Sequence, residues 1–160
     1  ELSVCQTSAQ GKVYIEVVTD VNVKVIFSYR VKYIQKVVYD QGILQTSHIE
    51  TYKNGKLHSE VWLKLQNNSY VLVRDGNTSK INETITYSGS LVYFNEPKGI
   101  TKIYKERSGE MKKISPIDKH VYTINDEIEK EISTYFYENG ILQFLKAKHP
   151  MGTIEFKKIA

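Results

Sequence analysis

The sequence YENGILQ, residues 137–143, has two close relatives in the same chain, YDQGILQ at 39–45 and YKNGKLH at 52–58. Asn-Gly and Gln-Gly pairs tolerate the positive φ angles of a two-residue type I′ hairpin turn, so each copy predicts a turn. The tyrosine and leucine of each copy then face each other across the hairpin, a pair that contributes about 0.2–1 kcal/mol. The predicted pairs are Tyr39 with Leu44, Tyr52 with Leu57 and Tyr137 with Leu142. We interpret the repeat as a folding signal, not as a signature of chemistry, and its uneven positions argue against a solenoid.

Further turn pairs divide the rest of the chain, at residues 10–11, 67–68, 75–76 and 108–109. Between the turns, β-branched and aromatic residues alternate with polar ones, most clearly over residues 12–27 and 57–65. A period of two predicts strands with one apolar face. Regular hairpin spacing without a long segment of helical period then predicts an antiparallel meander.

One region interrupts the alternation. Residues 88–99, SGSLVYFNEPKG, offer a serine as an N-cap and a Pro-Gly exit, which predicts one short helix near residues 89–95. We therefore expect an all-β fold in which a long-stranded antiparallel meander curls into a half-barrel, with the short helix against its concave side. Strands of about eleven residues span roughly 36 Å, long enough to curl strongly. A length of 160 residues, 41% of them hydrophobic, suits a single domain over residues 1–160.

Composition excludes several classes of protein. The net charge of +4 is carried by lysines spread along the chain, with arginine only at positions 30, 74 and 107, so we expect no nucleic-acid partner. Cys5 is the only cysteine, which excludes an intrachain disulfide and a cysteine-based zinc site. The apolar runs are too short for a membrane span, and no signal peptide is visible.

Catalytic and metal-binding motifs are also missing from the sequence. The four histidines, at positions 48, 58, 120 and 149, lack H-x-x-x-H or H-E-x-x-H spacing, and the serines lack a G-x-S-x-G motif. Glu96 and Glu106 are ten residues apart, a separation that defines no geometry for a carboxylate pair, and we favour structural roles for both. We expect Glu96 to contact a basic or backbone donor near the start of the 88–97 segment or on the following strand, residues 100–107. We expect no enzyme, no cofactor and no metal.

Strand register predicts one candidate site. If the turns at 41–42, 54–55 and 67–68 are two-residue loops, five polar or aromatic residues share the otherwise apolar face of the sheet. These residues are Tyr33, Gln35, His48, Glu50 and Arg74. Two alternatives follow: the polar end of this face is open to water, or it closes a ligand-binding cavity in which the polar groups must bond to one another.

The segment ITYSGSLVYFNEPKGITKIYKERSGEMKKI, residues 85–114, together with the Y-x-N-G-x-L hairpin and HPMGTIEFKKI, residues 149–159, resembles a bacterial family of secreted or periplasmic proteins classed as a domain of unknown function. The likeness covers almost the whole chain and is sharpest at Tyr93, Glu96, Pro97, Glu106 and the terminal hairpin. It implies an envelope location, a curved antiparallel sheet, and a signal peptide and part of a first strand ahead of this chain. It implies no activity. A looser likeness to half-barrel lipoprotein carriers concerns the fold alone.

Three functions remain open from the sequence. The first is a binding module that holds a lipid-like or other apolar ligand in the concave face, with Tyr93 and Glu96 joining the five register-predicted residues. The second is a structural or protein–protein interaction module of the envelope, which uses a face or an edge of its sheet. The third and least favoured is an enzyme. A deep apolar groove with a polar end would favour the first function, and a continuous closed core the second.

Overall fold

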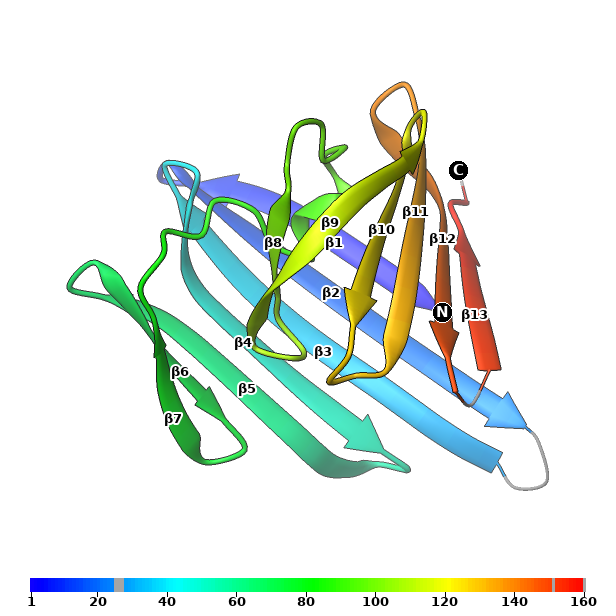
Figure 1. Ribbon diagram of the computed structural model, residues 1–160. Helices are drawn as coiled ribbons and strands as arrows, with labels where there is room; N and C mark the ends of the chain where they lie inside the picture. The colour runs from blue at the N-terminus through cyan, green and yellow to red at the C-terminus, as the bar shows by residue number, and fades with distance from the viewer. Residues whose placement is uncertain (25–27, 151, 160) are drawn as a thin grey trace. The chain divides into compact units, whose positions relative to one another are not determined.

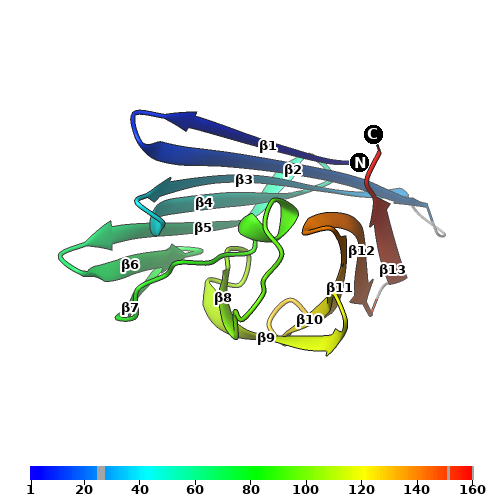
Figure 2. The ribbon, with the colours of Figure 1, turned by 90° about the horizontal axis from the view of Figure 1, so that it is seen from above.

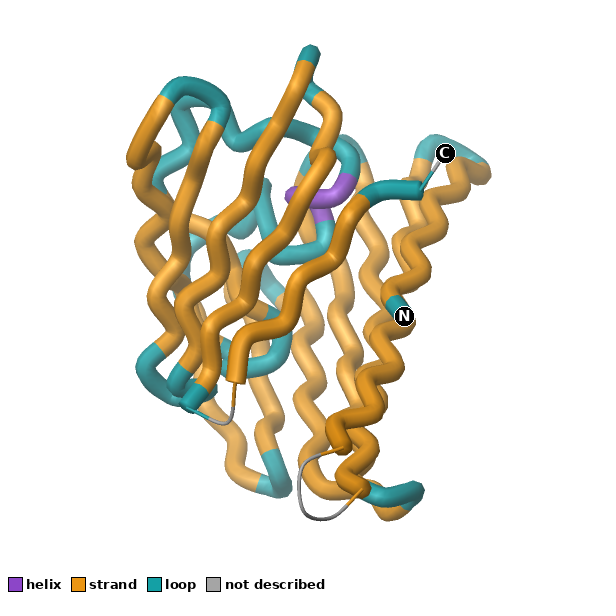
Figure 3. Tube along the Cα trace, turned by 90° about the vertical axis from the view of Figure 1, so that its right-hand side faces the viewer, coloured by secondary structure: helices purple, strands orange, loops and turns teal. Residues whose placement is uncertain are grey.

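The computed structural model describes residues 1–24, 28–150 and 152–159. The chain forms two compact units, Glu1–Thr86 and Tyr87–Ala160, each containing one antiparallel sheet (Figure 1). The predicted all-β meander is confirmed, and its strands belong to two sheets where the sequence analysis expected one. Within the described residues the one helical element is a 3₁₀ turn, Leu91–Tyr93, inside the predicted 89–95 segment and coloured purple in Figure 3. No helix in the described ranges has the length and apolarity needed to cross a bilayer.

The first sheet has seven strands that lie side by side in chain order. They are β1 (Leu2–Ala9), β2 (Lys12–Lys24), β3 (Ser28–Asp40), β4 (Ile43–Lys53), β5 (Lys56–Gln66), β6 (Ser69–Arg74) and β7 (Asn77–Ile81). The predicted turn pairs have the predicted conformation: Asn54 and Gly55 have φ angles of 50° and 79°, and Asn139 and Gly140 have 52° and 78°. Residues 25–27, at the end of the strand predicted over 12–27, lie outside the described residues.

A β-bulge follows the tyrosine–leucine pair of the first repeat. Tyr39 and Leu44 are Cα partners, as predicted, but the next pair is Val38 with Thr46. Gln45 is therefore an extra residue on β4 that has no counterpart on β3. A bulge of this kind shifts the register by one residue for the remainder of the strand pair.

The other two copies of the repeat have the same bulge. The extra residue is His58 in the second copy and Gln143 in the third. In the first and third copies the glutamine amide donates to a carbonyl two residues earlier, from Gln45 to Ile43 at 3.2 Å and from Gln143 to Ile141 at 3.3 Å. The seventh position of the repeat is thus the bulged residue in all three hairpins.

The first unit buries one face of its sheet. Its buried apolar residues are Ile15, Val17, Val37, Tyr39, Leu44, Ile49, Val61, Leu63, Tyr70, Leu72 and Ile85. Tyr70 joins the segment that follows β7 to this core, since its hydroxyl donates to the Leu44 carbonyl at 2.9 Å and accepts from the Ile85 amide at 3.2 Å. The hydroxyl of this buried tyrosine therefore has a partner both as a donor and as an acceptor.

The second unit has six strands, again in sequential order. They are β8 (Lys102–Lys105), β9 (Glu110–Asp118), β10 (Val121–Asp126), β11 (Glu131–Glu138), β12 (Ile141–His149) and β13 (Gly152–Lys157). Seen from above in Figure 2, these strands follow an arc, so this sheet by itself has the half-barrel curl that the sequence analysis expected. The larger first sheet is flatter in the same view.

The segment before β8 packs against the second sheet, as predicted. Val92 is fully buried, and its carbonyl accepts a hydrogen bond from the Tyr137 hydroxyl of β11 at 2.6 Å. Glu106 is 2% exposed and accepts a hydrogen bond from the Ser90 amide at 3.0 Å. A Cβ on Gly89 would lie 2.6 Å from Glu106 Oε2, so the close approach of this carboxylate requires a glycine.

Candidate functional site

The polar cluster predicted from register, Tyr33, Gln35, His48, Glu50 and Arg74, is divided between two faces of the first sheet. The two-residue turns are correct, but each of the first two bulges adds one residue, first to β4 and then to β5. Side chains alternate between faces, so a one-residue shift moves a side chain to the other side of the sheet relative to its neighbours. The prediction of one shared face is therefore wrong for His48 and Glu50.

The residues that remain on the buried face are Tyr33, Gln35 and Arg74. Gln35, Ile49, Val61 and Arg74 are successive Cα partners across β3 to β6. Gln35 is 9% exposed, and Arg74 Nε lies 3.8 Å from Asp75 Oδ2. Arg74, which the sequence predicted on the same face as His48, is thus on the opposite side of the sheet from that histidine.

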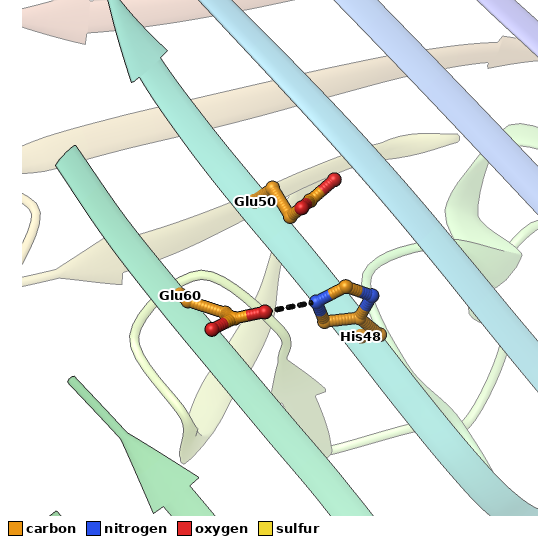
Figure 4. A group of neighbouring side chains, drawn as sticks. All are labelled: His48, Glu50 and Glu60. Carbon is orange, nitrogen blue, oxygen red and sulfur yellow. Dashed lines mark hydrogen bonds and ion pairs between the residues drawn. The ribbon is translucent and has the colours of Figure 1, made fainter. Parts of the chain in front are cut away.

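A different polar group forms on the other face of β4 and β5. His48 and Glu50 are two residues apart on β4, and Glu60 on β5 is the direct Cα partner of Glu50. Figure 4 shows His48 and Glu60 pointing toward each other between the two strands, with His48 Nε2 2.8 Å from Glu60 Oε1. One ligand atom from each of the three residues lies within 4.8 Å of the other two. We call these three residues the outer-face cluster.

Two aromatic residues orient the outer-face cluster. The Trp62 indole stacks on the His48 ring with centroids 3.6 Å apart and an interplanar angle of 10°, and its Nε1 donates to Glu60 Oε1 at 3.0 Å. The hydrogen bonds from His48 and Trp62 lower the pKa of Glu60, which keeps this carboxyl ionised. Partial burial and a hydrogen bond to Glu50 raise the pKa of Tyr52. The cluster is thus an imidazole between two carboxylates with defined orientations.

In the second unit, Glu96 lies in a separate polar group. Its side chain is 3% exposed, and its Oε1 is 2.7 Å from His120 Nδ1 and accepts from the Tyr122 hydroxyl at 2.9 Å. Lys98 Nζ lies 3.4 Å from the other carboxylate oxygen. Burial acts to raise the pKa of Glu96, but the hydrogen bonds from His120 and Tyr122 outweigh burial and lower it.

The predicted partners of Glu96 need correction. We expected a donor near the start of the 88–97 segment or on the strand over 100–107, and His120 and Tyr122 belong instead to the β9–β10 turn and to β10. The 100–107 strand supplies Glu106, which accepts from Ser90 as described above. Glu96 and Glu106 therefore connect the 88–97 segment to its sheet at two points, and both contacts are structural.

Tyr93, the other predicted binding residue of this segment, ends the 3₁₀ turn. Burial raises its pKa, and the nearby Tyr135 and Glu106 add to the effect. Its hydroxyl therefore stays protonated over the physiological pH range. Tyr93 belongs to the second unit, whereas His48 and Glu50 belong to the first.

The comparison with known families covers almost the whole chain. The model of a family described as a domain of unknown function, DUF6134, matches residues 1–159. The chain belongs to this family. No curated protein and no solved structure shows significant similarity to it. The DUF6134 description contains no activity, so the function has to be argued from the geometry of this chain.

Sequence reasoning missed Glu60, Trp62, His120 and Tyr122. Glu60 and Trp62 alternate with Leu63 along the strand, so the sequence places them on the face opposite Leu63. It places His48 and Glu50 on the same face as Leu63 when the bulges are overlooked. The recurring Gln or His at the seventh position of the repeat was the available signal. His120 and Tyr122 lie 24 and 26 residues from Glu96, and no local pattern connects residues so far apart.

Proposed function

We propose that this protein is a non-enzymatic structural and interaction module of the bacterial cell envelope that assembles through the edge that β1 forms in the described part of the first sheet. A periplasmic or secreted location is part of the proposal and is supported by the resemblance of residues 85–114 and 149–159 to an envelope family. The observation that carries the proposal is the composition of β1. Its eight residues, LSVCQTSA, include no charge and no proline, and they pair with β2 without a bulge.

The edge strands of the two sheets differ in how they oppose pairing with another strand. An unpaired edge is a template for another strand unless charges, short length, prolines or bulges protect it. Strand β7 contains a lysine, β8 has four residues of which two are lysines, and β13 contains a glutamate and a lysine. Strand β1 is longer than these three and has no such protection. It is therefore the edge best suited to accept a strand.

The hydrogen-bond pattern identifies which backbone groups of β1 face outward. Glu1 and Asp20 exchange both backbone hydrogen bonds, at 2.7 and 2.9 Å, so they form a hydrogen-bonded pair. In an antiparallel ladder, such pairs alternate with pairs whose amide and carbonyl groups point away from the partner strand. The uninterrupted β1–β2 register then assigns the outward groups. They belong to Leu2, Val4, Gln6 and Ser8.

The strand that adds to this edge is β1 of a second copy. Cys5 lies in the middle of β1 and is exposed, and an unpaired cysteine in a secreted protein is suited to intermolecular pairing. A two-fold axis at Cys5 would pair Val4 with Gln6 of the second copy. The backbone amides and carbonyls of these residues point outward, so they can form hydrogen bonds between the two strands. The two Cys5 residues would then form a non-hydrogen-bonded pair with Cα atoms about 4.5 Å apart, within the range of a disulfide.

The apolar-ligand function expected first depended on one polar anchor, in which Arg74 and His48 share a face. That anchor is divided between two faces, so no residue-level argument favours this function now. Of its predicted residues, Tyr33, Gln35 and Arg74 belong to the first unit, and Tyr93 and Glu96 to the second. The edge of β1 therefore supports the envelope-interaction function better.

The test compares Gln6→Pro with Gln6→Ala in the full chain. Proline removes the outward amide of Gln6 and keeps the bonds to β2, whereas alanine keeps that amide and serves as the matched control. We expect the wild type and Gln6→Ala to dimerise in sedimentation experiments and to form a Cys5 disulfide under mild oxidation. Gln6→Pro should remain monomeric with an unchanged thermal midpoint. A monomeric wild type at millimolar concentration, or a dimer that Gln6→Pro leaves intact, would overturn the proposal.

A further inference from the structure

The outer-face cluster brings two like charges opposite each other, whereas two other cross-strand pairs on the same face are of opposite charge. Glu16 on β2 is the Cα partner of Lys36 on β3, and their charged groups are 3.8 Å apart. Lys12 and Asp40 form a second opposite pair, at 4.0 Å. Glu50 and Glu60 are also direct partners, yet both are acidic, and like charges directly opposite each other destabilise a sheet.

His48 offsets this repulsion only in part. Its Nε2 lies 2.8 Å from Glu60 Oε1, but one imidazole carries at most a single positive charge against two carboxylates. Asp75 adds a third carboxylate close to the cluster, since its Oδ1 accepts a hydrogen bond from the Glu60 backbone amide at 2.8 Å. A cation with more than one charge would neutralise the group more completely than one hydrogen bond does.

The cluster is also oriented in advance for such a cation. Outer contacts that hold ligand side chains in place are typical of protein metal sites. Here Trp62 contacts both His48 and Glu60, and Tyr52 hydrogen-bonds Glu50. The side chains of His48 and Glu60 are 19% and 40% exposed, so an ion can reach them from solvent.

From this geometry we infer that His48, Glu50 and Glu60 form a binding site for a divalent transition-metal ion of the zinc class. One imidazole and two carboxylates suit zinc, copper or nickel, whereas magnesium and calcium prefer oxygen ligands alone. On binding, the ion replaces the hydrogen atom between His48 Nε2 and Glu60 Oε1. The metal-bound ring is neutral and keeps its proton on Nδ1. Water completes the coordination.

Only small side-chain movements are needed to close the site. Ligand atoms of a tetrahedral zinc site lie roughly 3.3 Å apart, given zinc bonds of about 2.0–2.2 Å. The three ligand atoms already lie within 4.8 Å of one another. Rotation of the two glutamate side chains can supply the difference while β4 and β5 stay in place. The ion would then join the two strands on the face opposite the buried core.

Trp62 provides a direct test because it is the only tryptophan of the chain. Its indole is stacked on the proposed ligand His48, so a paramagnetic ion bound there should quench its fluorescence. We expect saturable quenching by Ni²⁺ with a stoichiometry of one, reversal by chelator, and competition by Zn²⁺ but not by Mg²⁺. Calorimetry with Zn²⁺ should give the same stoichiometry.

Matched variants separate a defined site from general attraction to negative charge. His48→Gln and Glu60→Gln should each weaken Zn²⁺ binding at least about tenfold, because each removes a ligand. Glu16→Gln removes the same charge from the same face of the sheet and should change the affinity less than about twofold. His120→Gln tests the other histidine–glutamate contact and should have no effect. Circular dichroism and thermal midpoints verify that each variant is folded.

Three results would overturn the inference. The first is wild-type protein that shows no saturable binding of either ion at millimolar concentration. The second is an affinity that Glu60→Gln and Glu16→Gln reduce equally, which would indicate only diffuse electrostatic attraction. The third is binding that His120→Gln abolishes and His48→Gln leaves intact. The test does not involve the β1 edge, so its outcome is independent of the proposed assembly.

Discussion

The two units treat polar side chains in different ways. In the first, the outer-face cluster and the cross-strand ion pairs lie on a solvent-accessible face, and the other face is mostly apolar. In the second, charged groups are part of the interior: Glu106 is 2% exposed, and Arg107 contacts Glu129 at 2.9 Å and Glu131 at 3.1 Å. Buried charges require partners. We conclude that these charged residues of the second unit serve its fold, whereas the outer-face cluster of the first lies within reach of solvent.

The largest effect is expected from the apolar face of the first unit. Leu63 has no exposed surface, and Leu63→Ala should destabilise the first unit by about 4 kcal/mol, since truncation leaves a cavity. Its neighbour Trp62 is 47% exposed, and Trp62→Ala should cost about 1 kcal/mol or less. Urea denaturation followed by circular dichroism checks both variants. Equal costs would contradict the assignment of the two faces.

The second unit should be the more sensitive to acid. Burial alone would raise the pKa of Glu131, but the positive charges of Arg107 and Lys105 outweigh it and lower the pKa to about 2. A carboxyl whose pKa is lower in the folded than in the unfolded state contributes its full stabilisation at pH values above the unfolded-state pKa. This contribution is lost as the pH falls through the folded-state pKa. The loss should occur between pH 4.5 and about 2 and amount to about 3 kcal/mol.

Hydrogen exchange of residues 87–159 as a function of pH measures this loss. Glu131→Gln should lower stability at neutral pH and remove this part of the acid dependence. The matched control is Glu155→Gln, since Glu155 is half exposed and pairs with Lys146 in a surface contact at 3.3 Å. A wild-type second unit that is equally protected at pH 5 and pH 2.5 would show that this ion pair contributes nothing to stability.

A smaller effect is expected at the turns, and it should be similar in the two units. Gly140 and Gly55 have φ angles of 78° and 79°, with no atom within 4 Å of an added Cβ. Replacing either by valine introduces only backbone strain, which should cost about 1–2 kcal/mol. Unchanged urea midpoints for both variants would show that the turn conformation is not required.

The smallest effect is expected from removal of a bulge. Deletion of Gln45 removes the extra residue of β4 and leaves Leu44 and Ser47 on the buried face. The variant should lose only the local twist of the strand pair and the hydrogen bond from Gln45 to the Ile43 carbonyl. The expected decrease in stability is about 1 kcal/mol. Retained Ni²⁺ quenching of Trp62 would show that the outer-face cluster survives the deletion. A large destabilisation would mean that the bulge itself is needed for the fold.

The sequence predicted what depends on neighbouring residues. The Asn-Gly and Gln-Gly turns, the tyrosine–leucine pairs and the all-β class follow from local conformational preference, and the structure confirms each of them. The register beyond each pair was wrong because Gln45 and His58 resemble ordinary strand residues, and one unnoticed residue moves His48 to the other face. The partners of Glu96 were missed because tertiary packing, and no local pattern, brings His120 and Tyr122 to it.

The sequential strand order has a further consequence, for the path by which the chain folds. Within each sheet, every strand pairs with the next one along the chain, which gives a low contact order for a β protein. Closing a two-residue loop costs little chain entropy compared with joining distant segments, and folding rates rise as contacts become more local. Each hairpin can therefore select its register, bulge included, once its own residues have left the ribosome. The face on which His48 lies is then decided within the β3–β4 and β4–β5 hairpins.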